Sequence, residues 1–385
     1  MVHIAIPTLA ALAILSCLLL LWQWFAAQRF PLHATKPSGF APAVSILKPL
    51  KGCDDTTAAS LQSWFTQTYG GTREVLFGVA DAADPVCEIV RRLMAENPGC
   101  PARLVVCENL TGANAKVAKL AQLEKLAAHD LILISDADVR VPSDFLSNFV
   151  APLRDEETAL VNCFYRLAHP ATMAMQWEAV AVNADFWSQV LQSQTLQPLD
   201  FALGAAILVR RRSLAEIGGF APLANCLADD YQLGHRIARN GHRIALCPVV
   251  VECWDTSQNW TQVWSHQLRW ARTIRICRPL PYFFSILSNA SLWPLLWMTA
   301  ATATGEFWLT ALAVGCSLWL RMLLARMLQR RFTPERTLVS PFWLTPVKDL
   351  LQAALWLSAF LGRTVEWRGR KMKVRRDGTL LEINP

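Results

Sequence analysis

Charged residues are scarce in this 385-residue sequence: 17% are Asp, Glu, Lys or Arg, whereas 53% are hydrophobic. A mean hydropathy of +0.25 is too high for an ordinary soluble domain, and the composition excludes disorder, collagen-like repeats and a coiled coil. The charged residues thin out at the N-terminus and again beyond about residue 280. The sequence therefore predicts a membrane protein whose soluble-looking middle, about 240 residues, is large enough for one domain.

Paired cysteines and nucleotide-binding glycine loops are also missing. The 11 cysteines are an odd number without a CxxC pair, so we expect neither disulfides nor a zinc site, and a reducing compartment. The absence of GxGxxG and GxxxxGK[ST] loops disfavours dehydrogenases and P-loop proteins. The net charge of +7 comes without a basic stripe interleaved with aromatic residues. We therefore expect no nucleic-acid partner, but contact with an anionic membrane surface.

The apolar N-terminal segment predicts a membrane anchor. Residues 4–27 carry no charge and are long enough for a spanning helix. The alternative is a cleaved signal peptide, which would usually have a shorter apolar stretch behind a basic start. Arg29, His33 and Lys36 follow the segment, so the positive-inside rule places the middle of the chain in the cytoplasm.

Two further apolar segments, 281–304 and 307–328, predict a membrane hairpin with its turn at residues 305–306. Arg321 lies inside the second segment, where an ionisable group is costly. We expect it to snorkel or to contact a lipid headgroup rather than to take part in catalysis.

The last apolar run, residues 350–362, is short for a membrane span and is predicted to be an interfacial or re-entrant helix. The positive-inside rule keeps the basic tail behind it in the cytoplasm. That tail contains Arg363, Arg368, Arg370, Lys371, Lys373, Arg375 and Arg376. The predicted organisation is an anchor at 1–30, a cytoplasmic domain at 38–280, a hairpin at 281–328, and the interfacial helix with its tail at 340–385.

The middle domain has the pattern of an open α/β sheet. Residues 114–128 have helical spacing, with Val117, Leu120, Leu123 and Leu126 on one face. The apolar run at 131–135 suits a strand that is buried on both faces of a parallel sheet. Ligands on such sheets bind beyond the carboxyl ends of the strands. The predicted strands are 44–50, 74–80, 103–107 and 131–135.

Three acidic pairs follow predicted strands or a loop. They are Asp81 with Asp84, Asp136 with Asp138, and Asp229 with Asp230. An aspartate after a strand is also a common helix cap or turn residue, so each pair alone has a structural explanation. The second pair is the most informative because two carboxylates at the end of a buried strand can bind Mg²⁺ or Mn²⁺ and leave positions for phosphate oxygens.

A basic helix is predicted just before the hairpin. Arg269 and Trp270 are adjacent there, and Arg272 and Arg275 follow at spacings of three. These residues can form a cationic face for a diphosphate leaving group. The alternative is a juxtamembrane helix whose arginines contact lipid headgroups.

Taken in order, these motifs resemble the GT-A glycosyltransferases of family 2 and, more closely, the ceramide glucosyltransferases of family 21. The resemblance spans about residues 44–275 and extends to the anchor and the C-terminal hairpin. Residues 266–275 especially resemble bacterial members, which include glycosyltransferases of hopanoid biosynthesis. The motifs are VSILKPLKG, the DxxDP at 81–85, NAK at 114–116, SDADVRV, GGF at 218–220, ADDY and the RW pair.

The resemblance implies a role for each matching residue. Asp84 and Asp136 match the first and second aspartate positions of the family, Asp138 completes a DxD motif, and Asp230 matches the general base. Asp229 stands where the family often has Glu. Arg269 and Trp270 match the end of (Q/R)xxRW, whereas His266 departs from Gln or Arg at its start. Asp84 would contact the uridine or ribose, and Lys48, Lys51 and Lys116 are candidate nucleotide contacts or solvated lysines.

The implied activity is inverting transfer of a hexose, glucose or N-acetylglucosamine, from a UDP-sugar to a hydroxyl of a membrane lipid. Hopanoid and ceramide acceptors both stay open, and the implied location is a bacterial inner membrane with a cytoplasmic catalytic domain. A processive polysaccharide synthase shares the aspartates and the RW motif, but the few predicted spans offer little material for a channel. A non-enzymatic membrane scaffold would not need the aspartates.

Overall fold

The structure is a computed structural model that describes residues 2–34, 39–302, 307–333, 340–367, 370–375 and 378–382. This part of the chain divides into two compact units. The sheet unit comprises Leu32–His169, Pro198–Thr256 and Gly378–Pro385, and the helical unit comprises Met1–Pro31, Pro170–Gln197 and Ser257–Asp377. Lys36, the predicted turn at 305–306, and Arg368 and Arg376 of the basic tail lie outside the described residues.

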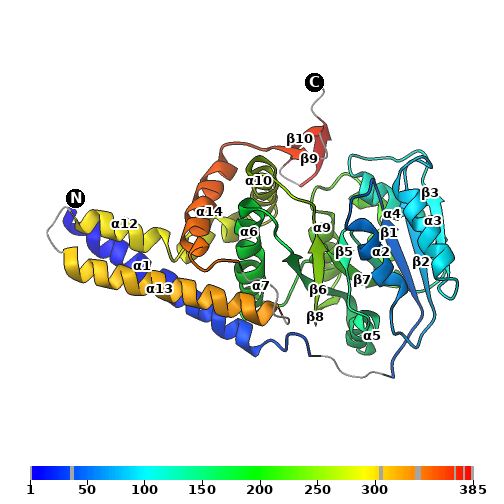
Figure 1. Cartoon of the computed structure of the whole chain (residues 1–385), viewed down its shortest axis with the longest axis horizontal. Coiled ribbons are helices and arrows are strands. Elements are labelled where there is room, and N and C mark those ends of the chain that lie inside the picture. Colours follow the sequence, from blue (N-terminus) through cyan, green and yellow to red (C-terminus); the bar gives the residue numbers. More distant parts are fainter. Residues whose placement is uncertain are drawn as a thin grey trace. The chain divides into compact units, whose positions relative to one another are not determined.

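Among the described residues, the sheet unit contains an eight-stranded sheet with the order β3-β2-β1-β4-β7-β6-β8-β5 (Figure 1). Strands β3, β2, β1 and β4 are parallel, and β7 joins β4 in the antiparallel sense. Four neighbouring strands thus end at the same edge of the sheet, where ligands of such folds bind. The strands are β1 (Val44–Pro49), β2 (Arg73–Val79), β3 (Ala102–Val106), β4 (Leu131–Ser135), β5 (Val139–Arg140), β6 (Thr158–Ala168), β7 (Ala206–Arg210) and β8 (Arg243–Trp254).

The four predicted strands are confirmed to within one residue at each end. All five residues of β4 are buried, as expected for a strand that is covered on both faces. The predicted helix is α4 (Ala115–Leu126), and Val117, Leu120 and Leu123 are buried on its inner face. Leu126 in its last turn is instead 42% exposed. The other helices of this unit are α2 (Thr57–Phe65), α3 (Val86–Glu96), α5 (Phe145–Val150), α8 (Arg211–Glu216) and α9 (Asp229–Arg239).

In the described part of the helical unit, two helices are long and apolar enough to cross a membrane: Ile6–Arg29 within α1 (Val2–Arg29), and α13 (Phe307–Phe332). The two lie side by side (Figure 1). Arg331 of α13 donates hydrogen bonds to the carbonyls of Ala27 (3.2 Å) and Phe30 (2.7 Å). Carbonyls at a helix C-terminus lack intrahelical partners, so Arg331 secures the end of α1. The unit also contains α6 (Met173–Val180), a π-helical turn (Ala181–Phe186), α7 (Trp187–Gln194), α10 (Trp260–Cys277) and α14 (Leu344–Phe360).

The segment predicted as the first arm of the hairpin, 281–304, contains two helices separated by a 3₁₀ turn. They are α11 (Pro279–Phe284) and α12 (Leu292–Ala301). The ten residues of α12 rise about 15 Å, half of a bilayer's hydrocarbon core. The membrane placement of this segment and of α14 stays a prediction. The compact units also group residues 170–197 and α10 with the membrane-type helices, whereas the sequence placed them in the catalytic domain.

The prediction that Arg321 snorkels to the lipid headgroups is wrong. Its side chain is buried in the protein and forms ion pairs with Asp185 (2.7 Å) and Asp349 (2.8 Å). Two carboxylates from elsewhere in the chain compensate its charge, so the guanidinium does not need water or lipid headgroups.

Candidate active site

Asp136 and Asp138 lie just beyond the carboxyl end of β4, where the sequence predicts them. The Asp136 amide donates to the carbonyl of Ala205 (3.3 Å), next to the start of β7, and the Trp254 amide donates to the carbonyl of Asp138 (3.1 Å). These bonds tie the acidic pair to the ends of three strands. The sheet therefore sets the position of its backbone, and the two carboxylates are carried by a rigid part of the fold.

Lys48 contacts the backbone of this acidic pair from the neighbouring strand β1. It lies on β1 beside β4, it is fully buried, and its ammonium lies 4.6 Å from the centre of the Trp64 ring. The ammonium donates hydrogen bonds to the Ser135 hydroxyl (3.3 Å) and to the Asp136 carbonyl. Burial lowers the pKa of Lys48 to about 7, although the neighbouring Asp138 and Asp136 favour the charged form. Its role in nucleotide binding stays a prediction.

Lys116 joins two of the acidic motifs. Its ammonium lies 2.6 Å from Asp136 Oδ1 and 3.4 Å from Asp229 Oδ2. Burial would lower the pKa of Lys116, but the two carboxylates outweigh burial and hold the pKa above its usual value. Asn114 orients this arrangement, because its side chain caps α4 at the Lys116 amide (3.1 Å) and donates to Asp229 Oδ1 (3.2 Å). The NAK motif (residues 114–116) thus links the DAD motif (residues 136–138) to the ADDY motif (residues 228–231).

Asp230, the predicted base, lies in the first turn of α9, and its Oδ1 accepts a hydrogen bond from the Tyr231 amide (2.8 Å). Burial, reinforced by the neighbouring carboxylate of Asp229, raises the pKa of Asp230 to about 6. Gly204 packs directly against this side chain: a Cβ at Gly204 would lie 2.6 Å from Asp230 Oδ2. The position therefore requires glycine if the carboxylate is to keep its place.

The cluster has more negative than positive charge. Asp136, Asp138, Asp229 and Asp230 contribute four carboxylates when ionised, and Lys48 and Lys116 contribute two ammonium groups, which leaves a net charge of −2. Burial is the main cause that raises the pKa of Asp138 to about 6, and the negative charge of the neighbouring Asp136 adds to it. Over the described residues, no three His, Cys, Asp or Glu side chains form a complete metal-binding group. The excess negative charge of the cluster suits a divalent cation, and Asp136 and Asp138 are the residues predicted to hold it.

Asp84 makes different contacts. Both of its carboxylate oxygens accept hydrogen bonds from the Gly52 amide (3.0 and 2.9 Å), and one of them also accepts from the Val86 amide (3.0 Å). Gly52 has a φ of +66°, which favours glycine at the end of VSILKPLKG. Asp84 thus holds the loop after β1, on which Lys51 is exposed. Nucleotide contacts by Asp84 and Lys51 stay predictions.

The HQLRW motif, residues 266–270, lies on α10 of the helical unit. His266 Nδ1 lies 2.7 Å from the buried carboxylate of Glu178, and Gln267 donates to the same oxygen (2.8 Å). The ring of Trp270 contacts His266, with 4.5 Å between ring centroids. Glu178 thus orients the first turn of the motif. The roles predicted for Arg269 and Trp270 at the leaving group stay predictions.

Arg272 and Arg275, predicted to extend a cationic face for the diphosphate, bind the chain itself. Arg272 donates to the carbonyl of Thr364, and Arg275 donates to the carbonyl of Gly362 (3.0 Å). The guanidinium of Arg275 also lies over the ring of Phe360, 5.4 Å from its centre. In the structure, these two arginines fasten the segment after α14 to α10.

Sequence reasoning missed Gly204, Lys119 and Glu178. Lys119 is buried, and its ammonium donates to the carbonyl of Leu50. A signal existed for Lys119, because spacings of three and four place it with Lys116 and Leu123 on one side of α4. No local pattern marks Gly204 or Glu178, because their importance arises from contacts with distant segments.

The fold is that of a GT-A glycosyltransferase. A mannosyltransferase from Pyrobaculum calidifontis, solved in complex with GDP-Man and Mn²⁺, is similar with a TM-score of 0.55 at 20% sequence identity. The match covers 91% of this chain and 99% of that chain. The family model of glycosyl transferase family 21 matches residues 8–380, so the chain belongs to this family. The predicted class, a sugar-transferring enzyme, is thereby confirmed.

The chain is also similar to ceramide glucosyltransferases of two eukaryotes. Ceramide glucosyltransferase 3 of Caenorhabditis elegans is 26% identical over 219 residues, which are 56% of this chain and 46% of that protein. Ceramide glucosyltransferase of Candida albicans is 31% identical over 121 residues, which are 29% of this chain and 22% of that protein. The alignments thus span less than half the length of these relatives.

The close approach of Gly204 to Asp230 predicts the effect of adding one methyl group. Gly204→Ala should lower turnover by about 10- to 100-fold, since displacement of a reacting group by about 1 Å can cost that much. Nucleotide binding, measured by calorimetry, should be unchanged. Gly99→Ala, where an added Cβ meets no atom within 4 Å, is the control. Wild-type turnover in Gly204→Ala would contradict the tight packing around Asp230.

The raised pKa of Asp230 predicts the pH dependence of turnover. Asp230 is the predicted base, and a base must be ionised, so we expect turnover to fall as the pH drops through about 6, the pKa of this carboxyl group. Turnover at saturating substrate should be measured from about pH 5 to 8, together with nucleotide binding at each pH, because Asp138 has a similar pKa. A profile that stays flat down to about pH 5 would contradict the assignment of a base with a raised pKa to Asp230.

Proposed function

We propose that this protein is a membrane-bound inverting glycosyltransferase that transfers a hexose from a UDP-sugar to a hydroxyl group of a membrane lipid. The observation that carries the proposal is the meeting of the DAD and ADDY motifs around Lys116 in a chain of glycosyl transferase family 21. A cluster of this kind can bind a diphosphate through a cation and place a carboxylate beside the attacking hydroxyl.

In the proposed reaction, the lipid hydroxyl attacks the anomeric carbon, and the bond from that carbon to the diphosphate oxygen breaks. The hydroxyl proton passes to Asp230, and the configuration at the anomeric carbon inverts. A single displacement needs only one base. A pKa near 6 leaves Asp230 ionised at neutral pH and still able to accept a proton.

Asp136 and Asp138 are the residues that would hold Mg²⁺ or Mn²⁺, and the excess negative charge of the cluster supports this assignment. A bound cation would neutralise charge that develops on the leaving diphosphate. Arg269 and Trp270 would assist at the leaving group. Lys48, Lys116 and Asp84 would bind or orient the nucleotide.

For the acceptor we propose a ceramide or another sphingolipid, or a hopanoid. The annotated relatives support the ceramide side of this proposal, whereas the hopanoid assignment depends on the resemblance of residues 266–275 to bacterial enzymes. The hexose would be glucose or N-acetylglucosamine. We place the enzyme in a bacterial inner membrane with its catalytic residues in the cytoplasm, because basic residues such as Arg29 follow the first apolar helix.

A processive polysaccharide synthase is the second candidate. It would use the same aspartates but would need a membrane channel for the polymer. Within the described ranges, two helices are long and apolar enough to span a membrane, and these offer little material for a channel. We therefore favour transfer of a single sugar to a lipid.

The roles of the aspartates can be separated by measuring nucleotide binding and turnover in the same variants. Asp230→Asn should lower turnover by about 10² to 10⁴-fold and leave UDP-sugar binding nearly intact, since a base acts in the transition state. Asp136→Asn should also weaken UDP-sugar binding. In the wild type, EDTA should abolish transfer, and added Mg²⁺ or Mn²⁺ should restore it.

Asp130→Asn is a matched control, because that side chain is 99% exposed on the sheet unit. It should behave as the wild type in both assays. Equal losses of nucleotide affinity in Asp136→Asn and Asp230→Asn would contradict the separate roles. Full activity in EDTA would contradict the metal assignment.

A further inference from the structure

A cavity of about 170 Å³ lies within the helical unit. Four charged side chains line it: Asp185, Arg321, Lys348 and Asp349. Each of these residues is at most 6% exposed. Ionisable residues among apolar membrane-type helices are costly, and they usually mark a functional site. Their arrangement indicates what the cavity can bind.

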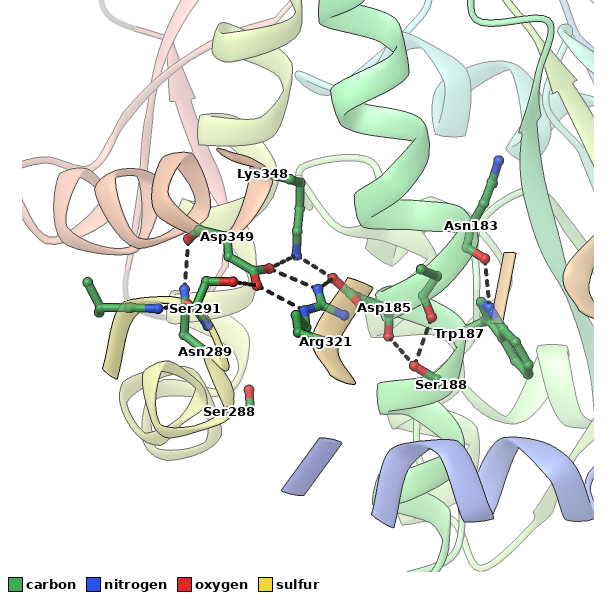
Figure 2. A network of polar contacts seen from close by, with 12 residues as sticks. Asn183, Asp185, Trp187, Ser188, Ser288, Asn289, Ser291, Arg321, Lys348 and Asp349 are labelled. Atoms are coloured by element: carbon green, nitrogen blue, oxygen red, sulfur yellow. Dashed lines mark hydrogen bonds and ion pairs between the residues drawn. The ribbon is translucent and has the colours of Figure 1, made fainter. Parts of the chain in front are cut away.

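The four charges form one network (Figure 2). The guanidinium of Arg321 donates to both carboxylate oxygens of Asp349 (2.9 and 2.8 Å) and to Asp185 Oδ2 (2.7 Å). The ammonium of Lys348 contacts Asp185 Oδ2 and lies 2.7 Å from Asp349 Oδ1. Ser291 donates to Asp349 Oδ2 (2.6 Å). The network therefore joins α13, α14 and the π-helical turn that carries Asp185, a type of turn that is frequent at functional sites.

The network is electrically balanced, with two cations and two carboxylates. An added phosphate or ammonium group would introduce an uncompensated charge into a buried site, which is unfavourable. The charge balance therefore favours a neutral ligand. In this respect the cavity differs from the acidic cluster of the sheet unit, where negative charge is in excess.

Three polar atoms of the lining have unused hydrogen-bonding capacity. They are Asp185 Oδ1, Arg321 Nη1 and Gln352 Oε1, each shielded from solvent and without a hydrogen-bond partner among the described residues. Buried polar atoms in proteins are nearly always paired, and leaving them unpaired is costly. The set contains one donor and two acceptors. A hydroxyl group both donates and accepts, so the polar character of these lining residues suits a ligand that carries hydroxyl groups.

Other walls of the cavity are aromatic. Trp270, Tyr282 and Trp356 line it together with the polar atoms. Tyr282 and Trp356 also bond each other's backbone: the Trp356 indole donates to the Tyr282 carbonyl (2.9 Å), and the Tyr282 hydroxyl donates to the Trp356 carbonyl (3.3 Å). These bonds hold both rings in place. Apolar walls around a few polar groups are typical of small-molecule sites.

We propose that this cavity binds the hydroxylated head of a neutral membrane lipid. The inference rests on the proposed function in one respect, because it identifies this lipid with the acceptor of the sugar. Trp270, which belongs to the RW motif, is one of the residues that line this cavity. Binding of an anionic phospholipid is the outcome that this proposal excludes.

The test uses the full-length protein in phosphatidylcholine nanodiscs. The probes are tritiated N-hexanoyl ceramide and a tritiated hopanoid with a polyol side chain, with dihexanoyl phosphatidylglycerol as the anionic comparison. Gln352→Leu removes one acceptor atom and should weaken binding of the preferred neutral probe by about 2- to 10-fold, the effect of one hydrogen bond. Ala181→Leu fills the cavity from its wall and should weaken binding by more than about 10-fold.

Gln329→Leu is the control, because this buried glutamine of α13 is not a lining residue. It should bind the probe within about twofold of the wild type. Thermal unfolding and UDP-sugar binding should be unchanged in each variant that is compared. The two cavity variants test the site independently, so a folding defect in one leaves the other informative.

The inference is wrong if folded cavity variants bind the neutral probes as the wild type does. It is also wrong if the wild type binds neither neutral lipid more tightly than phosphatidylglycerol. Sugar transfer is scored separately. A wild-type protein that binds a neutral lipid in this cavity without glycosylating it would contradict the proposed function and support the cavity assignment.

Discussion

The ammonium of Lys116 holds together two acidic motifs that are far apart in the sequence. It lies within 3.4 Å of carboxylates from the DAD and ADDY motifs, and Asn114 on the same helix turn braces one of them. Without this cation, the repulsion between the carboxylates would oppose their close approach. The position of α4 against the sheet therefore determines whether the cluster forms. The remaining negative charge makes the cluster suitable for a cation and a nucleotide diphosphate.

The helical unit uses buried charge in a different way. Around Arg321, two cationic side chains and two carboxylates balance one another in charge. What remains unpaired is a few individual polar atoms that lack a hydrogen-bond partner. An unbalanced cluster suits a charged donor substrate, whereas a balanced network suits a neutral polar group. The chain thus contains two polar sites whose electrostatics match the two substrates of the proposed reaction.

Much of the sheet unit could be predicted from the sequence because its signals are local. The apolar run of β4 and the helical spacing of α4 lie within single segments, so their boundaries agree with the prediction to within one residue or a few. The DAD motif directly follows a buried strand, so its position at the end of the sheet could also be predicted from the sequence. By contrast, the pairing of Arg321 with Asp185 depends on which helices meet, and the spacing within one helix does not encode that. The same is true of Gly204, which matters only because α9 places Asp230 beside it.

The most direct test of the account is to identify the product. Purified full-length protein in nanodiscs would be incubated with UDP-[¹³C]glucose or UDP-[¹³C]N-acetylglucosamine and with ceramide or hopanoid, and the lipids analysed by mass spectrometry and NMR. The account predicts a lipid that carries one labelled hexose with β configuration, the inverse of the α-linked donor. A polymer, an α-linked product or the absence of a glycosylated lipid with every donor and acceptor would contradict it.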